Sequence, residues 1–297
     1  MNYVITGGAG HISRPLAEQL LAAGHQVKVI GRNAAHLTPL TEKGATAAIG
    51  SVEDVSFLKQ AFAGADAVYT MVPPNFATKD LKAYIEQIVK NYAEAIRTNG
   101  IKYVVNLSSI GADLPGGTGP VTGLHRGERV LDALTEVNIL HLRPSYFYQN
   151  LLSNAGMAKQ MGIIGSNFSI PEGKLPLADP IDIADVAAEA LLSLDFTGHS
   201  ARYIASDETG TDEIATVLGN AIGKKDLKWI QFPDDQARQG MMQAGLPEEI
   251  AFNYTEMGQS MHSGKMLADY WKHHPEKMGK VKLDDFARQF AQAYNGS

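Results

Sequence analysis

The chain has 297 residues, of which 44% are hydrophobic and 20% are charged. Length alone suggests about two domains with a sizeable core. The 26 Lys and Arg residues against 32 Asp and Glu residues give a net charge of -6, which argues against nucleic acid and anionic membranes as partners. Cysteine is absent, so disulfides and a Cys nucleophile are excluded. With no signal-like start and no long apolar run, we predict a cytoplasmic protein.

Short runs rich in Val, Ile and Tyr alternate with amphipathic stretches through the first half of the chain. Strands are predicted at residues 3–6, 26–30, 45–49, 67–71, 102–107 and 138–142. Helices are predicted at residues 11–23, 54–62, 78–98 and 123–135. Because parallel strands need helical crossovers of one hand, this alternation predicts an α/β fold with a Rossmann-type, doubly wound parallel sheet.

The character of the chain changes near residue 150. We therefore predict a Rossmann NAD(P)-binding domain at residues 1–150 and a smaller, mostly helical substrate-binding part at residues 151–297. Part of this second region, about residues 181–206, is expected to return to the Rossmann sheet. Four segments are predicted after the first five predicted crossovers: a helix-like stretch at 146–161, a Gly, Ser and Pro-rich segment at 162–180, a helix at 183–194 and a strand at 202–205.

A glycine-rich turn joins the first predicted strand to the first predicted helix, with the sequence Thr6-Gly7-Gly8-Ala9-Gly10-His11-Ile12-Ser13. In this context the pattern is a dinucleotide fingerprint. Gly7 permits the tight turn, Gly10 lets the backbone approach a pyrophosphate, and the amides that start the helix face the negative charge. Ser13 takes the place of the third glycine.

The end of the second predicted strand indicates which nucleotide binds. Sites for NAD usually place Asp or Glu there, against the ribose hydroxyls. This chain has Arg32 and Asn33 instead, and Arg32 is able to pair with a 2′-phosphate. Arg14 adds a second cation, at a helix start that favours anions. Each Arg alone is also compatible with an ordinary surface residue, but together they favour NADP(H) over NAD(H).

Three motifs occur in order: Thr6-Gly7-x-x-Gly10, Leu107-Ser108-Ser109, and Arg143-Pro144-x-x-Phe147-x-x-Asn150. With them the sequence resembles the NmrA-like atypical short-chain dehydrogenases/reductases along nearly its whole length. The resemblance implies that residues after the fourth strand border the nicotinamide ribose and that the Arg-Pro-x-x-Phe segment flanks the nicotinamide. The fingerprint and the resemblance together give the expected cofactor-binding residues: Thr6, Gly7, Gly10, His11, Ile12, Arg32, Asn33, Val72, Pro73, Ser108, Tyr146 and Phe147.

Most short-chain dehydrogenases use a Tyr-x-x-x-Lys pair, in which Lys lowers the pKa of the Tyr phenol. None of the 11 tyrosines is followed by Lys four residues later. His125 stands in the corresponding region, three residues before Glu128, and quinone reductases of the resembled family have a His and a Glu there. We predict His125 as a proton donor to the substrate, with pairing to Glu128 on a helix surface as the alternative. Ser108 is a second catalytic candidate, with a turn or helix-cap hydroxyl as its alternative.

The sequence thus predicts an NADPH-dependent oxidoreductase that transfers hydride to a quinone, a dye or another conjugated acceptor. The alternative is a non-catalytic NADP(H)-binding redox sensor, and only this alternative requires a protein partner. The expected partner of the enzyme is a small-molecule substrate, and a homodimer stays open. No His, Asp and Glu spacing indicates a metal site, so none is predicted.

Overall fold

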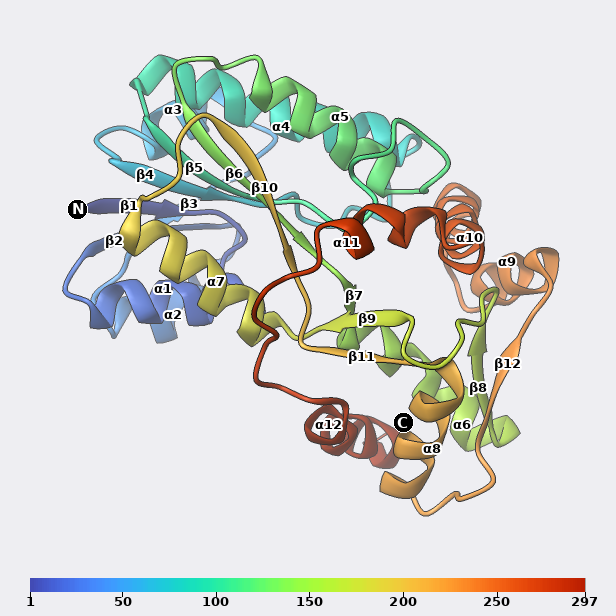
Figure 1. Ribbon diagram of the computed structural model, residues 1–297. Helices are drawn as coiled ribbons and strands as arrows, with labels where there is room; N and C mark the ends of the chain where they lie inside the picture. The colour runs from blue at the N-terminus through green and yellow to red at the C-terminus, as the bar shows by residue number, and fades with distance from the viewer. Residues whose placement is uncertain (297) are drawn as a thin grey trace.

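The computed structural model describes residues 1–296 and is organised around one seven-stranded sheet (Figure 1). The strand order is β10-β6-β5-β4-β1-β2-β3, and every neighbouring pair is parallel. The strands are β1 (Asn2–Ile5), β2 (Gln26–Gly31), β3 (Thr46–Ile49), β4 (Ala67–Thr70), β5 (Tyr103–Leu107), β6 (Asn138–Pro144) and β10 (His199–Ile204). The predicted doubly wound α/β fold is confirmed. The order reverses between β1 and β4, where such sheets bind ligands.

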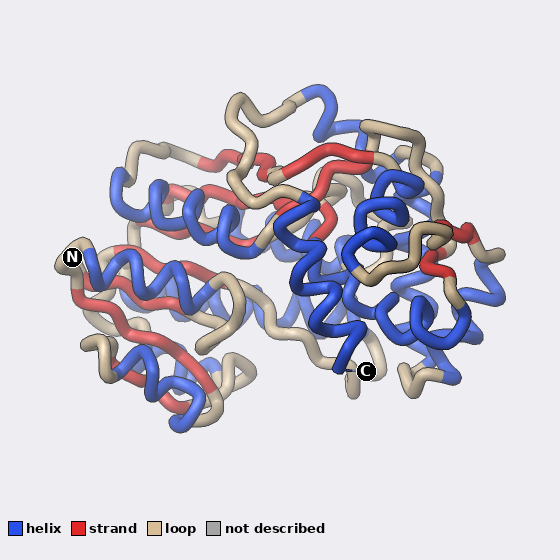
Figure 2. The backbone as a smooth tube through the Cα atoms, turned by 90° about the horizontal axis from the view of Figure 1, so that it is seen from below, coloured by secondary structure: helices blue, strands red, loops and turns tan. Residues whose placement is uncertain are grey.

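Helices cover both faces of this sheet (Figures 1 and 2). One layer contains α1 (Ser13–Ala22), α2 (Ala34–Thr41) and α7 (Pro180–Ser193), and the other contains α3 (Val55–Ala61), α4 (Leu81–Asn99) and α5 (Val121–Asp132). The apolar face of each layer packs on the sheet: Leu16 and Leu191 are fully buried on the first side, and Leu58 and Ile96 on the second. Both faces are covered, so strands such as β4 are buried along their whole length.

Apart from α7 and β10, the chain after β6 packs beyond the carboxyl ends of the sheet and contains two small sheets beside its helices (Figure 1). One has the order β11-β9-β7 and the other pairs β12 with β8. The strands are β7 (Tyr146–Phe147), β8 (Ile163–Ser166), β9 (Leu175–Ala178), β11 (Asp207–Thr209) and β12 (Lys228–Gln231). The helices are η1 (Tyr148–Asn154), α6 (Ala155–Met161), α8 (Thr211–Ala221), α9 (Asp234–Gln243), α10 (Glu248–His262), η2 (Lys265–Leu267), α11 (Ala268–Lys272) and α12 (Leu283–Gly296).

The structure corrects the sequence-based elements in three places. Helix α2 was not predicted; the Asn33 side chain caps it by accepting from the Ala35 N–H at 2.9 Å, but the helix is short and holds Pro39. The stretch 146–161, expected to be helix-like, begins instead as strand β7, because Tyr146 and Phe147 pair with β9. The segment 162–180 holds strands β8 and β9. In each strand correction, a partner distant in sequence overrides the local pattern.

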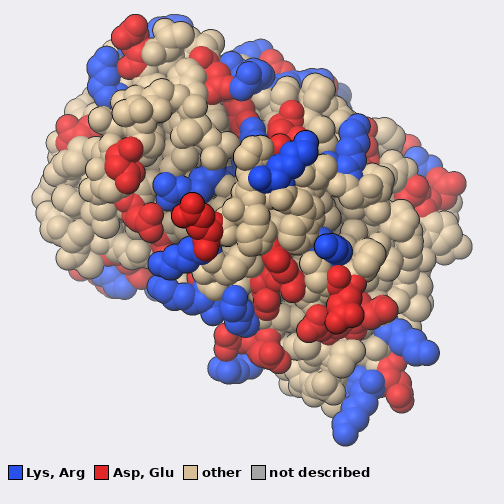
Figure 3. Space-filling view, viewed as in Figure 1, with Lys and Arg blue, Asp and Glu red and all other residues tan. Residues whose placement is uncertain are grey.

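Charged groups of both signs are interspersed on the molecular face of Figure 3, and neither sign forms a continuous field there. Within residues 1–296, no helix is long and apolar enough to cross a membrane.

Candidate functional site

A cavity of about 890 Å³ opens at the carboxyl ends of the central strands. Its walls come from the residues that follow β1, β2, β3 and β4, from the end of β5, and from the segment after β6. Open α/β sheets bind ligands at this edge, near the strand where the order reverses. The cavity is therefore the place to test the expected cofactor residues.

The glycine turn after β1 forms the centre of the cavity wall. Gly7 has φ +92°, and a Cβ there would lie 2.5 Å from Ser13 Oγ and 2.9 Å from Met71 Cγ. A Cβ on Gly10 would lie 3.1 Å from the Gly7 carbonyl oxygen. Ser13 is buried and its hydroxyl donates to the Thr6 carbonyl at 2.8 Å, so this serine closes the turn where a third glycine was expected. Gly7 and Gly10 therefore have no space for a Cβ, and the turn leaves its backbone beside the cavity.

The start of α1 points its positive end at this turn. No side chain caps its first turn, and that turn holds no acidic residue. His11, Ile12 and Arg14 lie on the cavity wall at the same place. A helix start without a side-chain cap or an acidic residue attracts anions through its backbone N–H groups and its dipole. The wall fits a pyrophosphate at this point.

The wall after β2 contains Arg32, which is exposed. No carboxylate among residues 1–296 forms an ion pair with it. Arg14 differs, because its Nε lies 3.1 Å from Glu18 Oε1.

Sequence reasoning missed two residues of this wall, His36 and Glu53. His36 lies four residues after Arg32, whereas Glu53 follows β3 and places a carboxylate on the same wall.

The structure brings eight of the twelve expected cofactor residues to the cavity wall: Gly7, Gly10, His11, Ile12, Arg32, Asn33, Pro73 and Phe147. The other four lie behind or beside it. Thr6 is buried and its hydroxyl accepts from the Met71 N–H at 2.9 Å. Val72 packs among apolar residues of α4. The Tyr146 ring meets Phe168 edge-on at 5.6 Å, and Ser108 is buried.

The Ser108 hydroxyl belongs to a buried ionic network. It donates to Glu128 Oε1 at 2.6 Å. Glu128 is 2% exposed and pairs with Arg143, whose Nη2 lies 2.7 Å from Oε2 and whose Nε lies 3.1 Å from Oε1. Arg143 also donates to the Tyr203 hydroxyl at 3.2 Å. The paired carboxylate raises the pKa of Arg143 despite the opposing effect of burial, so this guanidinium stays charged. A catalytic role for Ser108 remains a prediction.

His125 is half-buried on α5 and is not one of the residues that line the cavity. Its Nδ1 lies 2.8 Å from the Ala112 carbonyl oxygen. The alternative of pairing with Glu128 is wrong, because Glu128 bonds to Ser108 and Arg143. A carbonyl only accepts hydrogen bonds, so Nδ1 is the donor in this contact.

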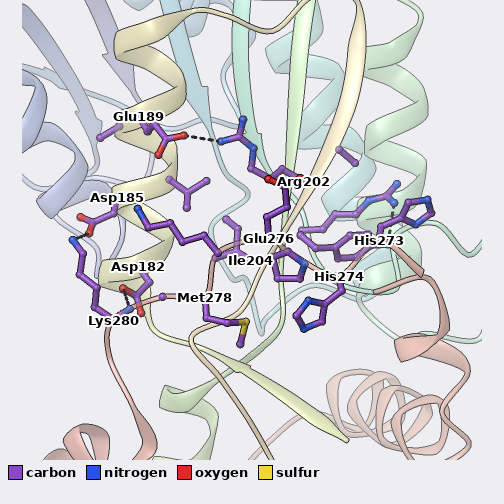
Figure 4. Close-up of a pocket in the computed structure, with 18 of the residues that line it drawn as sticks. Asp182, Asp185, Glu189, Arg202, Ile204, His273, His274, Glu276, Met278 and Lys280 are labelled. Carbon is purple, nitrogen blue, oxygen red and sulfur yellow. Dashed lines mark hydrogen bonds and ion pairs between the residues drawn. The ribbon is translucent and has the colours of Figure 1, made fainter. Parts of the chain in front are cut away.

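A second cavity, of about 980 Å³, lies along β10 on the outer edge of the sheet (Figure 4). Ion pairs join several of the charged side chains that line it. Lys280 Nζ lies 2.9 Å from Asp185 Oδ2, and Arg202 Nη1 lies 3.3 Å from Glu189 Oε1, as Figure 4 shows. It contains no glycine turn and none of the expected cofactor residues. Within residues 1–296, no group of three or more His, Asp or Glu residues is placed to hold a metal ion.

Comparison with known proteins agrees with the geometry. Residues 7–159 match a family model described as NAD(P)H-binding. The uncharacterized oxidoreductase YesF of Bacillus subtilis is 26% identical over 271 residues, which cover 88% of this chain and 85% of that protein. The fold is similar to the NADPH-dependent quinone oxidoreductase of Escherichia coli, solved with NADPH (TM-score 0.78, 20% identity, 97% and 99% of the two chains covered). It is also similar to the Citrobacter sp. triphenylmethane reductase (TM-score 0.75, 19% identity, 98% and 100% covered).

Proposed function

Because this chain belongs to the NAD(P)H-binding family, in its NmrA-like group of atypical short-chain dehydrogenases/reductases, we propose that it is an NADPH-dependent reductase of conjugated small molecules. The proposed acceptors are quinones, dyes or activated alkenes. The observation that carries this proposal is the cavity at the sheet edge, which combines a glycine cradle, a cation and an aromatic side chain. These three features match the pyrophosphate, the 2′-phosphate and the nicotinamide of one dinucleotide.

The wall after β2 supports NADPH rather than NADH. Arg32 is exposed on this wall and has no carboxylate partner among the described residues, so its guanidinium is available to a 2′-phosphate. His36, in the first turn of α2, lines the same cavity. Glu53 also lines the cavity, and its carboxylate repels a phosphate. Preference for NADPH over NADH therefore depends on the attraction between Arg32 and the 2′-phosphate.

The nicotinamide end lies at the carboxyl ends of β5 and β6. Leu107, Phe147 and Pro180 form an apolar wall there. Bound NADPH supplies a hydride, and the acceptor also takes up one proton. His125 is the proposed source of that proton, since the Ala112 carbonyl orients its ring through Nδ1. A delocalised acceptor spreads the incoming charge, so it needs less acid catalysis than a ketone, which agrees with the missing Tyr-x-x-x-Lys pair.

The proposal is tested by fluorescence titration of the purified protein with NADPH and NADH. A panel of quinones, azo dyes and triphenylmethane dyes is then added while absorbance is followed at 340 nm. We expect tighter binding of NADPH and acceptor-dependent oxidation. Binding of NADPH without oxidation of any acceptor would contradict the reductase and favour the redox sensor.

A matched pair of variants separates the cavity from the rest of the fold. A Cβ on Gly10 meets the Gly7 carbonyl at 3.1 Å and intrudes on the expected pyrophosphate position, so Gly10→Ala should weaken NADPH binding at least tenfold. A Cβ on Gly156, in α6, meets nothing within 4 Å, so Gly156→Ala should bind like the wild type. Equal affinities of the two variants would exclude this cavity as the cofactor site.

A further inference from the structure

Gln149 carries an unused hydrogen-bond acceptor at the cavity. Its side chain lines the cavity two residues after Phe147, and its Oε1 is buried without a hydrogen-bond partner. A buried acceptor left without a donor costs about 1–3 kcal/mol. The residue is therefore expected to have a partner that the polypeptide itself does not supply.

A second unused acceptor lies next to it. Asp179 is 1% exposed, and its Oδ1 caps α7 by accepting from the Ile181 N–H at 2.8 Å, whereas its Oδ2 has no partner. The register of the small sheet explains the proximity: Phe147 pairs with Ala178 in parallel strands, so Gln149 and Asp179 both lie within two residues of this pair. Burial raises the pKa of Asp179, and the Gln149 amide is one of the groups that lower it.

These two side chains complement each other in one orientation only. An ionised carboxylate accepts hydrogen bonds and cannot donate them, so it attracts the amide nitrogen of Gln149. With its amide nitrogen donated to Asp179, the Gln149 side chain keeps Oε1 as the acceptor for a ligand in the cavity that it lines. One acceptor is then satisfied within the protein, and the other faces the ligand.

We propose that Gln149, held by Asp179, recognises the amino group of the nicotinamide carboxamide. The proposal rests on the proposed function, because it takes the dinucleotide as the ligand of this cavity. NADP(H) carries primary amino groups at the adenine and at the carboxamide. Gln149 follows β6, whereas Arg32 follows β2 on the other side of the glycine turn, so Gln149 meets the nicotinamide end. Gln149 is thus a positioning residue that fixes the plane of the carboxamide.

The test compares NADP⁺ with its 3-acetylpyridine analogue, in which a methyl group replaces the amino group and the carbonyl is retained. Dissociation constants are measured by isothermal titration calorimetry for the wild type, for Gln149→Met, and for Gln243→Met, an exposed control on α9. We expect the wild type and the control to bind NADP⁺ about 5- to 150-fold more tightly than the analogue, the range for one unpaired buried acceptor. In Gln149→Met the ratio should fall to about 1.

Each outcome decides the proposal. A wild-type ratio near 1, or a ratio that Gln149→Met leaves unchanged, overturns it. Equal weakening of both dinucleotides in Gln149→Met also overturns it, because Gln149 then contacts another part of the ligand. Binding of 2′,5′-ADP, which lacks nicotinamide, should be equal in all three proteins and reports folding. Failure of the wild type to bind either dinucleotide or 2′,5′-ADP would instead refute the proposed function.

Discussion

Removal of the Glu128 carboxylate should destabilise the protein strongly. Glu128→Ala deletes the partner of two Arg143 contacts, at 2.7 and 3.1 Å, and the acceptor of the Ser108 hydroxyl at 2.6 Å. Breaking a buried ion pair by removing one partner costs about 3–5 kcal/mol. The Arg143 side chain is 13% exposed and keeps Asp269 at 3.7 Å, which offsets part of the loss. We therefore expect the free energy of unfolding to fall by about 2–4 kcal/mol.

The assay is urea unfolding followed by circular dichroism at 25 °C, with Glu136→Ala as the control because Glu136 is exposed. A loss of less than about 1 kcal/mol in Glu128→Ala would refute the reasoning, since it would mean that the pair contributes no more than an exposed one. Ser108→Ala should cost about 1.5–3 kcal/mol through the same carboxylate. The double variant should lose less free energy of unfolding than the two single variants together, because both substitutions remove the same hydrogen bond between Ser108 and Glu128.

Three further predictions concern the cofactor, the proton and pH. Arg32→Ser should raise the Kd for NADPH about 10- to 150-fold and leave that for NADH within twofold; equal effects would contradict 2′-phosphate recognition. His125→Ala should lower kcat about 100-fold, and a change below threefold between pH 6 and 8 would exclude acid catalysis. Asp179→Asn should raise the melting temperature at pH 7–8, because burial raises the pKa of Asp179 and its ionised form destabilises the fold; the gain should vanish below about pH 4, where the carboxyl is protonated in both states. A gain independent of pH in melting curves would contradict this assignment.

The central sheet was predictable because its strands are short apolar runs between turn residues. The predicted segments 26–30 and 138–142 lie within β2 and β6, and 67–71 exceeds β4 by one residue. The small sheets were not predictable from local pattern. β8 pairs with β12, whose residues lie 65 positions later, and the two residues of β7 depend on β9 for their extended conformation.

In the candidate site, too, some residues were predictable from local sequence and others were not. The glycine turn is continuous in sequence, so its residues reach one wall through local geometry alone. Gln149 and Asp179 are 30 positions apart and meet only through the pairing of β7 with β9, and neither carries a motif. Glu128 was expected beside His125 from their helical spacing. A guanidinium from β6 binds it instead, and helical periodicity contains no information about the neighbouring strand.

The two ends of the cavity are formed by different parts of the chain, so a motion of one part does not affect both ends equally. Phe147 and Gln149 lie where the chain leaves the central sheet after β6, and Pro180 lies where it returns from β9 to α7. Gly7 and Arg32 follow β1 and β2 within the sheet layer. A displacement of the two small sheets and their helices against the central sheet would therefore shift the wall at the proposed nicotinamide end and leave the proposed phosphate-binding end in place. Substrate-dependent motion should accordingly change the proposed hydride transfer more than cofactor affinity.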